Sequence, residues 1–440
     1  MSQPLAYDDA LAALSERGRF GIRLGLGRTR ALLRALGDPH TAVRGALVAG
    51  TNGKGSVLAL AGSALRSAGL RVGMTPKPHL VSYRERIEVD GQPIDRAAFA
   101  RHVEVVLGAA DTLARRYGAL TEFELLTAVV FRHFAEADLD VALVEVGLGG
   151  RLDATHAWNG GVAVITNVDL DHQDRLGSTI PAIAREKAAI IERGNLAVTG
   201  ASGDALAVIE RRARRLRVPL RIALPAAILG WDRDGIDVDL AGLGPTRVGL
   251  RGRHQAANVA VADALLDALE AAGIATVPET ARHRGYADAR WPGRLERLDG
   301  ERGDVLLDGA HNPAGATALA RALDDLRPYL RPGPISLVTA SMADKDVDGV
   351  IRALARAHAL KDATIVATSV DLPRALPAVE LAERWRILAP NIRRVLSIDD
   401  PAAALEHALA AAGPTVVAGS LYLVGAARAI LVDDPELRDP

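Results

Sequence analysis

The stretch VAGTNGKGSV, residues 48–57, decides the fold, because it sets three glycines and a lysine between a strand pattern and a helix pattern. GALVAG (45–50) is a short apolar run closed by glycine, and SVLALAGSALRSAGL (56–70) has the apolar spacing of a helix. Loop N–H groups and a helix N-terminus then converge on one point, which suits an anion such as phosphate. The loop departs from the usual GxxxxGK template, and an ordinary glycine-rich turn is the alternative.

Strand and helix patterns alternate on the C-terminal side of this loop. The expected strands are LDVALVEVGLGG (139–150), GGVAVITNVDLDH (160–172) and NLAVTG (195–200), with a helix in STIPAIAREKAAIIERG (178–194). This alternation predicts an α/β fold with a parallel, doubly wound sheet. Residues 219–252 change to short alternating segments, which predict a small antiparallel appendage, and a helix is expected near HQAANVAVADALLDAL (254–269).

A second series of strand and helix patterns follows WPGRLE (291–296). Its expected strands are DVLLDGA (304–310), PISLVTA (334–340), ATIVATS (363–369) and PTVVAGS (414–420), each followed by a helical segment. The Trp291-Pro292-Gly293 cluster interrupts the periodicity, so the boundary is placed between Tyr286 and Arg294. The sequence therefore predicts domains at 1–290 and 291–440, the second a Rossmann-like α/β domain.

Composition excludes several classes of function. The 440 residues carry a net charge of -1 and only 3% aromatics, which argues against nucleic acid or an anionic membrane as the main partner. The absence of cysteine excludes disulfides and thiolate chemistry. The start MSQPLAYDDA lacks the pattern of a signal peptide, and the apolar runs are too short to cross a bilayer. A cytoplasmic protein that acts on small molecules is expected, and a monomer.

Lysine is scarce, which makes each lysine informative. Only five of the 53 basic residues are lysines, namely Lys54, Lys77, Lys187, Lys345 and Lys361. A lysine that persists in such a chain is a candidate for a site that needs a compact ammonium, or an amine able to lose its proton. Chance retention is the alternative for any one of them, and it is the preferred reading of Lys361.

Polar residues at the ends of the apolar strands are candidate ligands, because ligands of open α/β sheets bind at the carboxyl edge. Glu145 ends one strand, and a carboxylate buried there needs a partner, with an ion pair to Arg151 as the alternative. Asn167 ends the next strand and leads to Asp169, Asp171 and His172. Ser56 is placed to offer its hydroxyl to Mg²⁺. Lys187 interrupts an otherwise apolar helix face, and His172 alone would more often be structural.

Several segments together resemble the folylpolyglutamate synthase/dihydrofolate synthase family, which belongs with the Mur ligases. They are AGTNGKGSV, LTEFELLTAVVF, ALVEVGLGGRLDAT, ITNVDLDHQDRLGSTIPAIAREKAAII, GRHQAANVA, WPGRLE, LLDGAHNPAG, MADKD and GSLYLVG. The resemblance covers nearly the whole chain in order. It implies an enzyme that phosphorylates a carboxylate with ATP and lets the amine of L-glutamate displace the phosphate, so that an amide forms.

The resemblance also implies roles for individual residues. ATP would be bound by Asn52, Gly53, Lys54, Gly55, Ser56, Asn258, Arg294, Asp308 and His311, and Mg²⁺ by Ser56, Glu145, His172 and Lys187. Lys187 matches a lysine that reacts with CO₂ to become a carbamate, which arginine cannot do. Lys54, Lys187, His172 and His311 are the candidate catalytic residues. Nucleotide contacts in both domains imply closure about a hinge near 286–294.

The pteroate or folate acceptor is expected in the first domain. Its candidate residues are Arg23, Leu24, Gly25, Leu26, Lys77, His79, Thr121, Glu122, Phe123, Glu124, Leu152, Asp153 and Ala154. Core packing would also explain Phe123, and a helix capping box would explain Thr121 and Glu124 equally well. Where the family usually has Ser-Pro-His, this chain has Lys77-Pro78-His79. Lys77 is expected either to neutralise phosphate charge in place of one metal ion or to point into solvent.

Three readings of function stay open at this point. The first is a ligase for dihydropteroate, for reduced folates or for both. The second is a Mur-type or other amide ligase with a different carboxylate acceptor, although only about 45 residues precede the loop strand. The third is a nucleotide-gated switch without catalysis, which would not need a lysine able to form a carbamate.

Overall fold

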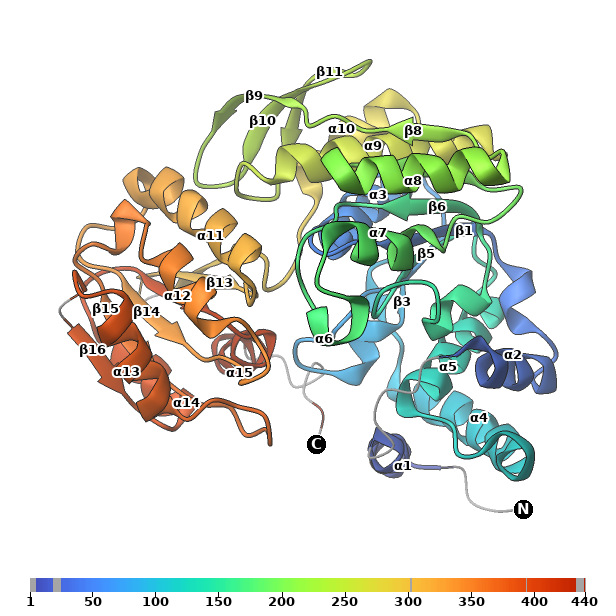
Figure 1. Ribbon diagram of the computed structural model, residues 1–440, viewed down its shortest axis with the longest axis horizontal. Helices are drawn as coiled ribbons and strands as arrows, with labels where there is room; N and C mark the ends of the chain where they lie inside the picture. Colours follow the sequence, from blue (N-terminus) through green and yellow to red (C-terminus); the bar gives the residue numbers. More distant parts are fainter. Residues whose placement is uncertain (1–4, 19–24, 301–302, 393, 433–438, 440) are drawn as a thin grey trace. The chain divides into compact units, whose positions relative to one another are not determined.

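The computed structural model describes residues 5–18, 25–300, 303–392, 394–432 and 439, and their contacts divide the chain into two compact units (Figure 1). Unit 1 comprises Met1–Pro225, Ala257–Tyr286 and Asp439–Pro440, and unit 2 comprises Ala226–Ala256 and Ala287–Arg438. The predicted domains 1–290 and 291–440 stay a prediction, because a division by contacts does not test which segments fold independently.

Unit 1 contains an eight-stranded sheet in the order β4-β3-β2-β5-β1-β6-β7-β8. Its strands are β1 (Gly45–Ala49), β2 (Val72–Thr75), β3 (Glu88–Val89), β4 (Gln92–Pro93), β5 (Val141–Glu145), β6 (Gly161–Ile165), β7 (Leu196–Thr199) and β8 (Leu220–Ile222). All neighbours pair in parallel except for β3, which pairs antiparallel with β2 and β4. Val48 of β1 lies opposite Glu145 of β5 and Val164 of β6, so the carboxyl ends of three central strands meet at one edge.

Helices cover this sheet, and β1, β2 and β5 are buried along their whole length, as expected for parallel strands with both faces covered. The helices are α1 (Tyr7–Gly18), α2 (Leu26–Ala35), α3 (Lys54–Ser67), α4 (Arg96–Tyr117), α5 (Glu122–Glu136), α6 (Gln173–Leu176), α7 (Ile180–Ala188), α8 (Gly203–Leu216), α9 (Gln255–Ala271) and α10 (Glu279–Asp288). One apolar core joins residues of α1, α4, α5, α7 and α8. Elsewhere α10 packs against α3, where a Cβ on Gly285 would clash with the backbone of Ala64. None of the described helices is long and apolar enough to span a membrane.

Unit 2 contains two sheets. The smaller is antiparallel, in the order β11-β10-β9, and consists of β9 (Ala227–Trp231), β10 (Ile236–Leu240) and β11 (Gly244–Val248). The larger has the order β12-β13-β17-β14-β15-β16, and only β12 is antiparallel in it. Its strands are β12 (Glu296–Gly300), β13 (Gly303–Asp308), β14 (Ser336–Thr339), β15 (Thr364–Ala367), β16 (Arg394–Ser397) and β17 (Thr415–Ala418).

The helices of unit 2 form two groups, and neighbouring helices within each group pack against one another (Figure 1). The first group is α11 (Pro313–Leu326), α12 (Val347–Leu354) and α13 (Ala378–Leu388), and the second is α14 (Pro401–Leu409) and α15 (Leu421–Leu431). Strands that alternate with helices produce the Rossmann-like arrangement that the sequence predicted.

The predicted fold class is confirmed, and two details differ. The segment around Leu220–Ile222 was assigned to the antiparallel appendage, but β8 pairs in parallel with β7 in the large sheet. The appendage is confined to 227–248, and its contacts group it with unit 2 rather than with unit 1. Within 139–150 the strand ends at Glu145, as the sequence predicted, and Gly149 and Gly150 follow it with positive φ angles of 66° and 156°.

Two histidines lie between α4 and α5. His102 is fully buried, and His133 Nδ1 lies 3.4 Å from His102 Nε2. Glu136 Oε2 lies 3.6 Å from the same nitrogen. Burial lowers the pKa of His102 to about 4, and the positive charges of His133, Arg101 and Arg132 lower it further while Glu136 opposes them. Burial also lowers the pKa of His133. Both imidazoles are therefore neutral in the folded protein near pH 7.

We predict that this pair makes the fold sensitive to acid. Between pH 6.5 and about 4 the unfolded chain protonates His102 and the folded chain does not, so stability falls as pH falls through that window. One such proton gives a slope of about 1.4 kcal/mol per pH unit. Urea unfolding of His102→Gln across this range should show a shallower slope than the wild type. His407→Gln, at an exposed position, should keep the wild-type slope; an equal slope in all three proteins would contradict the prediction.

Candidate active site

The loop between β1 and α3 is held by the end of β6. The N–H of Thr51 donates to the Asn167 carbonyl at 3.1 Å, and the N–H of Asn52 donates to Asn167 Oδ1 at 2.9 Å. Thr166 Oγ1 donates to the Asn52 carbonyl at 2.6 Å. Gly53 follows with a φ of 79°, and α3 begins at Lys54. The strand–loop–helix unit predicted from the sequence is present, with its N–H groups at the N-terminal end of a 14-residue helix.

Lys54 joins this loop to Glu145 at the end of β5. Its Nζ donates to the carbonyls of Gly50 and Thr51 at 3.1 and 3.2 Å and lies 3.8 Å from Glu145 Oε1. Glu145 is buried, with 2% of its surface exposed. Arg151, the alternative partner of Glu145, instead pairs with Glu186 at 2.9 Å. The buried carboxylate therefore lies beside the ammonium group of the loop.

Lys187 reaches the same loop from α7. Its Nζ donates to the Gly50 carbonyl at 3.0 Å, and the residue is only 4% exposed. Burial lowers the pKa of Lys187 to about 7, helped by the positive charge of Lys54 and opposed by Asp171 and Asp153. A substantial fraction of the amine is therefore unprotonated at neutral pH, which an arginine at this position would not permit.

Lys77, which follows β2, makes a second set of contacts to Glu145. Its N–H donates to Glu145 Oε2 at 3.0 Å, and its Nζ donates to the Glu145 carbonyl. The Nζ also lies 5.1 Å from the ring centroid of Phe123. Burial lowers the pKa of Lys77 to about 8, opposed by the charges of Asp153 and Glu145.

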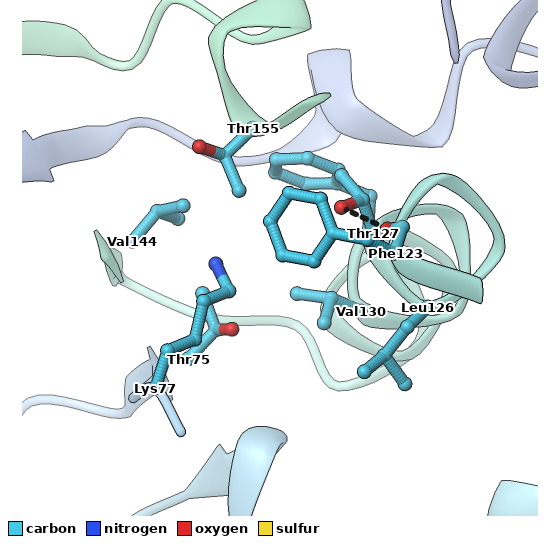
Figure 2. Close-up of a pocket in the computed structure, with 9 residues that line it drawn as sticks. Thr75, Lys77, Phe123, Leu126, Thr127, Val130, Val144 and Thr155 are labelled. Atoms are coloured by element: carbon cyan, nitrogen blue, oxygen red, sulfur yellow. Dashed lines mark hydrogen bonds between the residues drawn. The ribbon is translucent and has the colours of Figure 1, made fainter. Parts of the chain in front are cut away.

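Figure 2 shows the Lys77 side chain pointing into a small pocket. The pocket has a volume of about 10 Å³, room for a single water molecule, and it is mostly apolar. Its lining residues are Thr75, Lys77, Phe123, Leu126, Thr127, Val130, Phe131, Val144 and Thr155. The alternative in which Lys77 points into solvent is therefore excluded, and its role in neutralising phosphate charge stays a prediction.

The two segments expected to hold the acceptor meet next to this pocket. The N–H of Gly25 donates to the Leu152 carbonyl at 3.4 Å, directly before Leu26 begins α2. Asp153 is buried and accepts from the N–H of Leu148 at 2.8 Å and from Thr155, which fixes the turn that contains Ala154. Arg23 and Leu24, the first two residues of the RLGL segment, lie outside the described residues.

The capping box expected at the start of α5 is present. Thr121 Oγ1 accepts from the N–H of Glu124 at 3.3 Å, and Glu124 Oε2 accepts from the N–H of Thr121 at 2.9 Å. Arg28 of α2 also donates to Glu124 at 2.8 Å. Thr121 and Glu124 thus fix the start of the helix, and Phe123 in its first turn packs on Gly147 and Lys77.

His79 belongs to a cluster with Tyr83 and Arg86. Arg86 Nε donates to His79 Nδ1 at 2.8 Å, so the imidazole proton is on Nε2. The His79 and Tyr83 rings lie 4.4 Å apart, and the Tyr83 hydroxyl donates to Glu122 at 2.8 Å. Burial and the charge of Arg86 lower the pKa of His79 to about 3. Tyr83 and Arg86 were not predicted from the sequence, because only their contacts in the fold identify them.

The candidate metal ligands are less closely assembled. Ser56 is buried in the first turn of α3. His172 has a φ of 49° and a side chain that is 44% exposed, with its Nε2 3.9 Å from Asp171 Oδ2. In the part of the chain that the structure describes, no three histidine or acidic side chains gather as a metal site. The hydroxyl of Ser56 and the carboxylate of Glu145 are oxygen ligands of the kind that Mg²⁺ binds.

Unit 2 gathers its candidate nucleotide ligands around Gly309. Asp308, which ends β13, accepts from the N–H groups of Leu295 and Ala310 at 2.8 and 2.9 Å. Burial raises its pKa, and the charge of Arg294 opposes this. Arg294 donates to the Gly293 carbonyl at 3.3 Å, and His311 Nδ1 donates to the Gly309 carbonyl at 2.8 Å. Asn258, in α9, lies in unit 1 beside Gly53.

Comparison with known proteins agrees with this arrangement. Residues 48–266 match the Mur ligase middle domain, and residues 293–426 match the Mur ligase glutamate ligase domain. The dihydrofolate synthase/folylpolyglutamate synthase of Bacillus subtilis is 34% identical over 95% of this chain and 97% of its own length. The chain belongs to the folylpolyglutamate synthase/dihydrofolate synthase family. Membership confirms the predicted enzyme class, an ATP-dependent ligase.

Two solved structures of this family superpose on the chain. Mycobacterium tuberculosis folylpolyglutamate synthase, complexed with ADP and AMPPCP, has a TM-score of 0.85 and 33% identity, with 97% of this chain and 100% of that chain covered. The bifunctional enzyme of Yersinia pestis, complexed with AMPPNP and a manganese ion, has a TM-score of 0.80 and 30% identity, with 98% of this chain and 100% of that chain covered. Family members of this fold thus bind nucleotides and a divalent cation.

We predict that Gly53 is required for two separable reasons. Gly53 and Gly69 share a left-handed backbone, with φ of 79° and 82°, but a Cβ on Gly53 would meet Asn258 Oδ1 whereas Gly69 faces open space. Gly69→Ala should cost about 1–2 kcal/mol of unfolding free energy from backbone strain alone. Gly53→Ala should cost more, measured by urea unfolding.

The excess cost at Gly53 tests the contact with Asn258. In the Gly53→Ala/Asn258→Ala double variant, the penalty for adding the Cβ should fall to the value at Gly69, because the clashing atom is removed. Equal penalties for the two single glycine variants would contradict this account of the loop.

Proposed function

We propose that this enzyme joins the amine of L-glutamate to the carboxylate of a pteroate or folate acceptor at the expense of ATP. The acceptor carboxylate attacks the γ-phosphorus, ADP leaves, and an acyl phosphate forms. The glutamate amine then attacks the acyl carbon and loses one proton, the C–O bond to the phosphate breaks, and the amide forms as hydrogen phosphate leaves. The observation that carries the proposal is the convergence of Lys54, Lys187 and Glu145 on one glycine loop, in a chain that matches its relatives along nearly its full length.

The loop is proposed to hold the nucleotide phosphates. Asn52, Gly53, Lys54, Gly55 and Ser56 would supply N–H groups, one ammonium and one hydroxyl, which stabilise charge as it moves onto the leaving phosphate. From elsewhere in the chain the proposed nucleotide contacts are Asn258, Arg294, Asp308 and His311. The ADP, AMPPCP and AMPPNP named in the complexes of relatives support an ATP substrate here.

Lys187 is proposed to act as a carbamate. Its unprotonated amine would attack CO₂, form a C–N bond and release one proton, which turns a cation into an anion beside Gly50. The pKa of about 7 and the burial of the side chain support this. With His172 these residues would hold a divalent cation, which would offset charge on the phosphate oxygens. The manganese ion of the Yersinia pestis structure supports a metal, and Mg²⁺ is the ion proposed.

The acceptor is proposed to bind beside the Lys77 pocket. The turn Leu152–Ala154, Gly25 and Leu26, the Phe123 ring and the Nε2–H of His79 would form its surroundings, together with Glu122. Thr121 and Glu124 would act through the start of α5, since both are already used in the capping box. Arg23 and Leu24 stay predictions from the sequence.

The proposal is tested by ADP release from purified protein with Mg-ATP, L-glutamate and one acceptor at a time. Turnover with dihydropteroate is expected, and turnover with tetrahydrofolate as well would make the enzyme bifunctional. Lys187→Ala should abolish turnover, because the anionic oxygen is lost, and Lys187→Arg should not restore it. Lys361→Ala, at an exposed lysine, should leave turnover unchanged.

Each outcome of this experiment decides a different point. Turnover with neither acceptor would refute the folate proposal and favour the alternative, a ligase of another carboxylate. Full activity of Lys187→Ala would refute the role of Lys187. Depletion of CO₂ and bicarbonate, followed by their return, should remove and restore activity if the carbamate is required. Cytoplasmic location and a monomeric state stay predictions from the sequence.

We further predict that Lys77 takes the place of one metal ion in neutralising phosphate charge. Its ammonium lies at Glu145 and below the Phe123 ring rather than in solvent. Lys77→Ser should raise the Mg²⁺ concentration needed for half-maximal activity about tenfold, or change the cooperativity of the Mg²⁺ titration, since one missing charge must be replaced. An unchanged Mg²⁺ titration of Lys77→Ser would exclude this role.

A further inference from the structure

Asp439, the penultimate residue, contacts two segments of unit 1, namely Tyr7 of α1 and the pair Ser82 and Tyr83. Asp439 accepts hydrogen bonds from the Tyr7 hydroxyl, from Ser82 Oγ at 2.7 Å and from the N–H of Tyr83 at 2.7 Å. Three donors from two separate segments thus converge on one carboxylate. The contact spans 432 positions of sequence between Tyr7 and Asp439.

The surroundings of this carboxylate are rigid and buried. Ser82 is fully buried and Tyr7 is 8% exposed, with its ring against Phe99 at 5.5 Å. Ser82 also closes a capping box with Glu85, whose carboxylate accepts from the N–H groups of Leu80, Val81 and Ser82. Burial and Asp439 both raise the pKa of Tyr7, so the phenol stays protonated and donates. Hydrogen bonds to an ionised acceptor are the stronger kind, so Asp439 holds this segment firmly.

The segment that Asp439 holds is the one that contains His79. The N–H of Tyr83 donates to Asp439, and its hydroxyl donates to Glu122 at 2.8 Å. The centroid of its ring lies 4.4 Å from that of the His79 ring. Arg86 lies over the same ring at 5.2 Å and donates to His79 Nδ1. A displacement of the Tyr83 backbone would therefore move the His79 Nε2–H and release Glu122.

We propose that Asp439 is a positioning residue for the carboxylate acceptor, because it fixes Tyr83 and thereby orients His79 and Glu122. Asp439 is in this sense a part of the acceptor site. The inference rests on the proposed function, since His79 and Glu122 face the acceptor only if that assignment holds. Asp439 makes no contact with substrate and takes no part in the chemical steps.

The test compares Asp439→Asn with the wild type in steady-state ADP release. The KM for the pteroate or folate acceptor should rise about fivefold, equivalent to about 1 kcal/mol, while kcat and the KM for ATP change less than about twofold. Asp362→Asn removes the same charge at an exposed position of unit 2 and should leave all three constants unchanged. Tyr7→Phe removes one of the three donors and should raise the acceptor KM by a smaller factor.

A second measurement tests the contact without activity. Ultraviolet titration of tyrosinate should show a tyrosine whose pKa falls in Asp439→Asn, because Asp439 raises the pKa of Tyr7. A shifted titration with an unchanged acceptor KM would show a purely structural contact and overturn the inference. An unshifted titration would show that the contact does not form in solution, with the same consequence. A parallel fall of kcat and of the melting temperature at constant KM would also overturn it.

The two proposals fail in different ways. A wild-type enzyme that uses no pteroate or folate acceptor refutes the proposed function and, with it, the acceptor role of Asp439. A wild-type enzyme that turns over dihydropteroate while Asp439→Asn keeps the wild-type KM refutes only the inference about Asp439.

Discussion

The candidate site depends on one buried carboxylate, Glu145, at the end of the strand next to β1. Lys54 approaches the carboxylate from the loop, the N–H of Lys77 donates to it, and the Lys77 Nζ donates to the backbone carbonyl of Glu145. An isolated carboxylate at 2% exposure would be costly to bury, so the cations around it are a condition of the fold as well as of the site. Without Glu145 the same cations would repel one another in a region of low dielectric. The strand order puts β2, β5 and β1 side by side, and this adjacency brings the groups together.

Lysine rather than arginine is needed around this carboxylate for a physical reason. When several ammonium groups are buried near one carboxylate, desolvation and mutual repulsion disfavour their protonated forms and lower their pKa values. Burial lowers the pKa of Lys77, beside Glu145, to about 8, and that of Lys187, which donates to Gly50 of the adjacent loop, to about 7. A guanidinium would stay charged in the same place. A chain that otherwise uses arginine thus keeps lysine at this edge of the sheet, where a buried cation must be able to lose its proton.

Much of the fold could be predicted because apolar runs report burial directly. The strands of both parallel sheets follow such runs, and the glycine loop between β1 and α3 marked the central strand. Leu220–Ile222 was misassigned because a three-residue strand at the sheet edge, partly exposed, has no distinctive periodicity. The grouping of β9–β11 with unit 2 could not be read either, since it depends on contacts with segments distant in sequence.

Site residues could be predicted where a charged side chain interrupts an apolar pattern, and they could not be predicted where the local sequence is common. Lys187 and Glu145 were conspicuous because a charge inside an apolar pattern has to be explained. Thr121 and Glu124 had two valid interpretations, and the structure shows that the capping box is formed. Tyr83, Arg86 and Asp439 have unremarkable local sequences, and their importance follows only from partners far along the chain. Hydrogen bonds between residues far apart in the chain produce no repeating pattern in the sequence, so the residues that position a site are the hardest to predict from it.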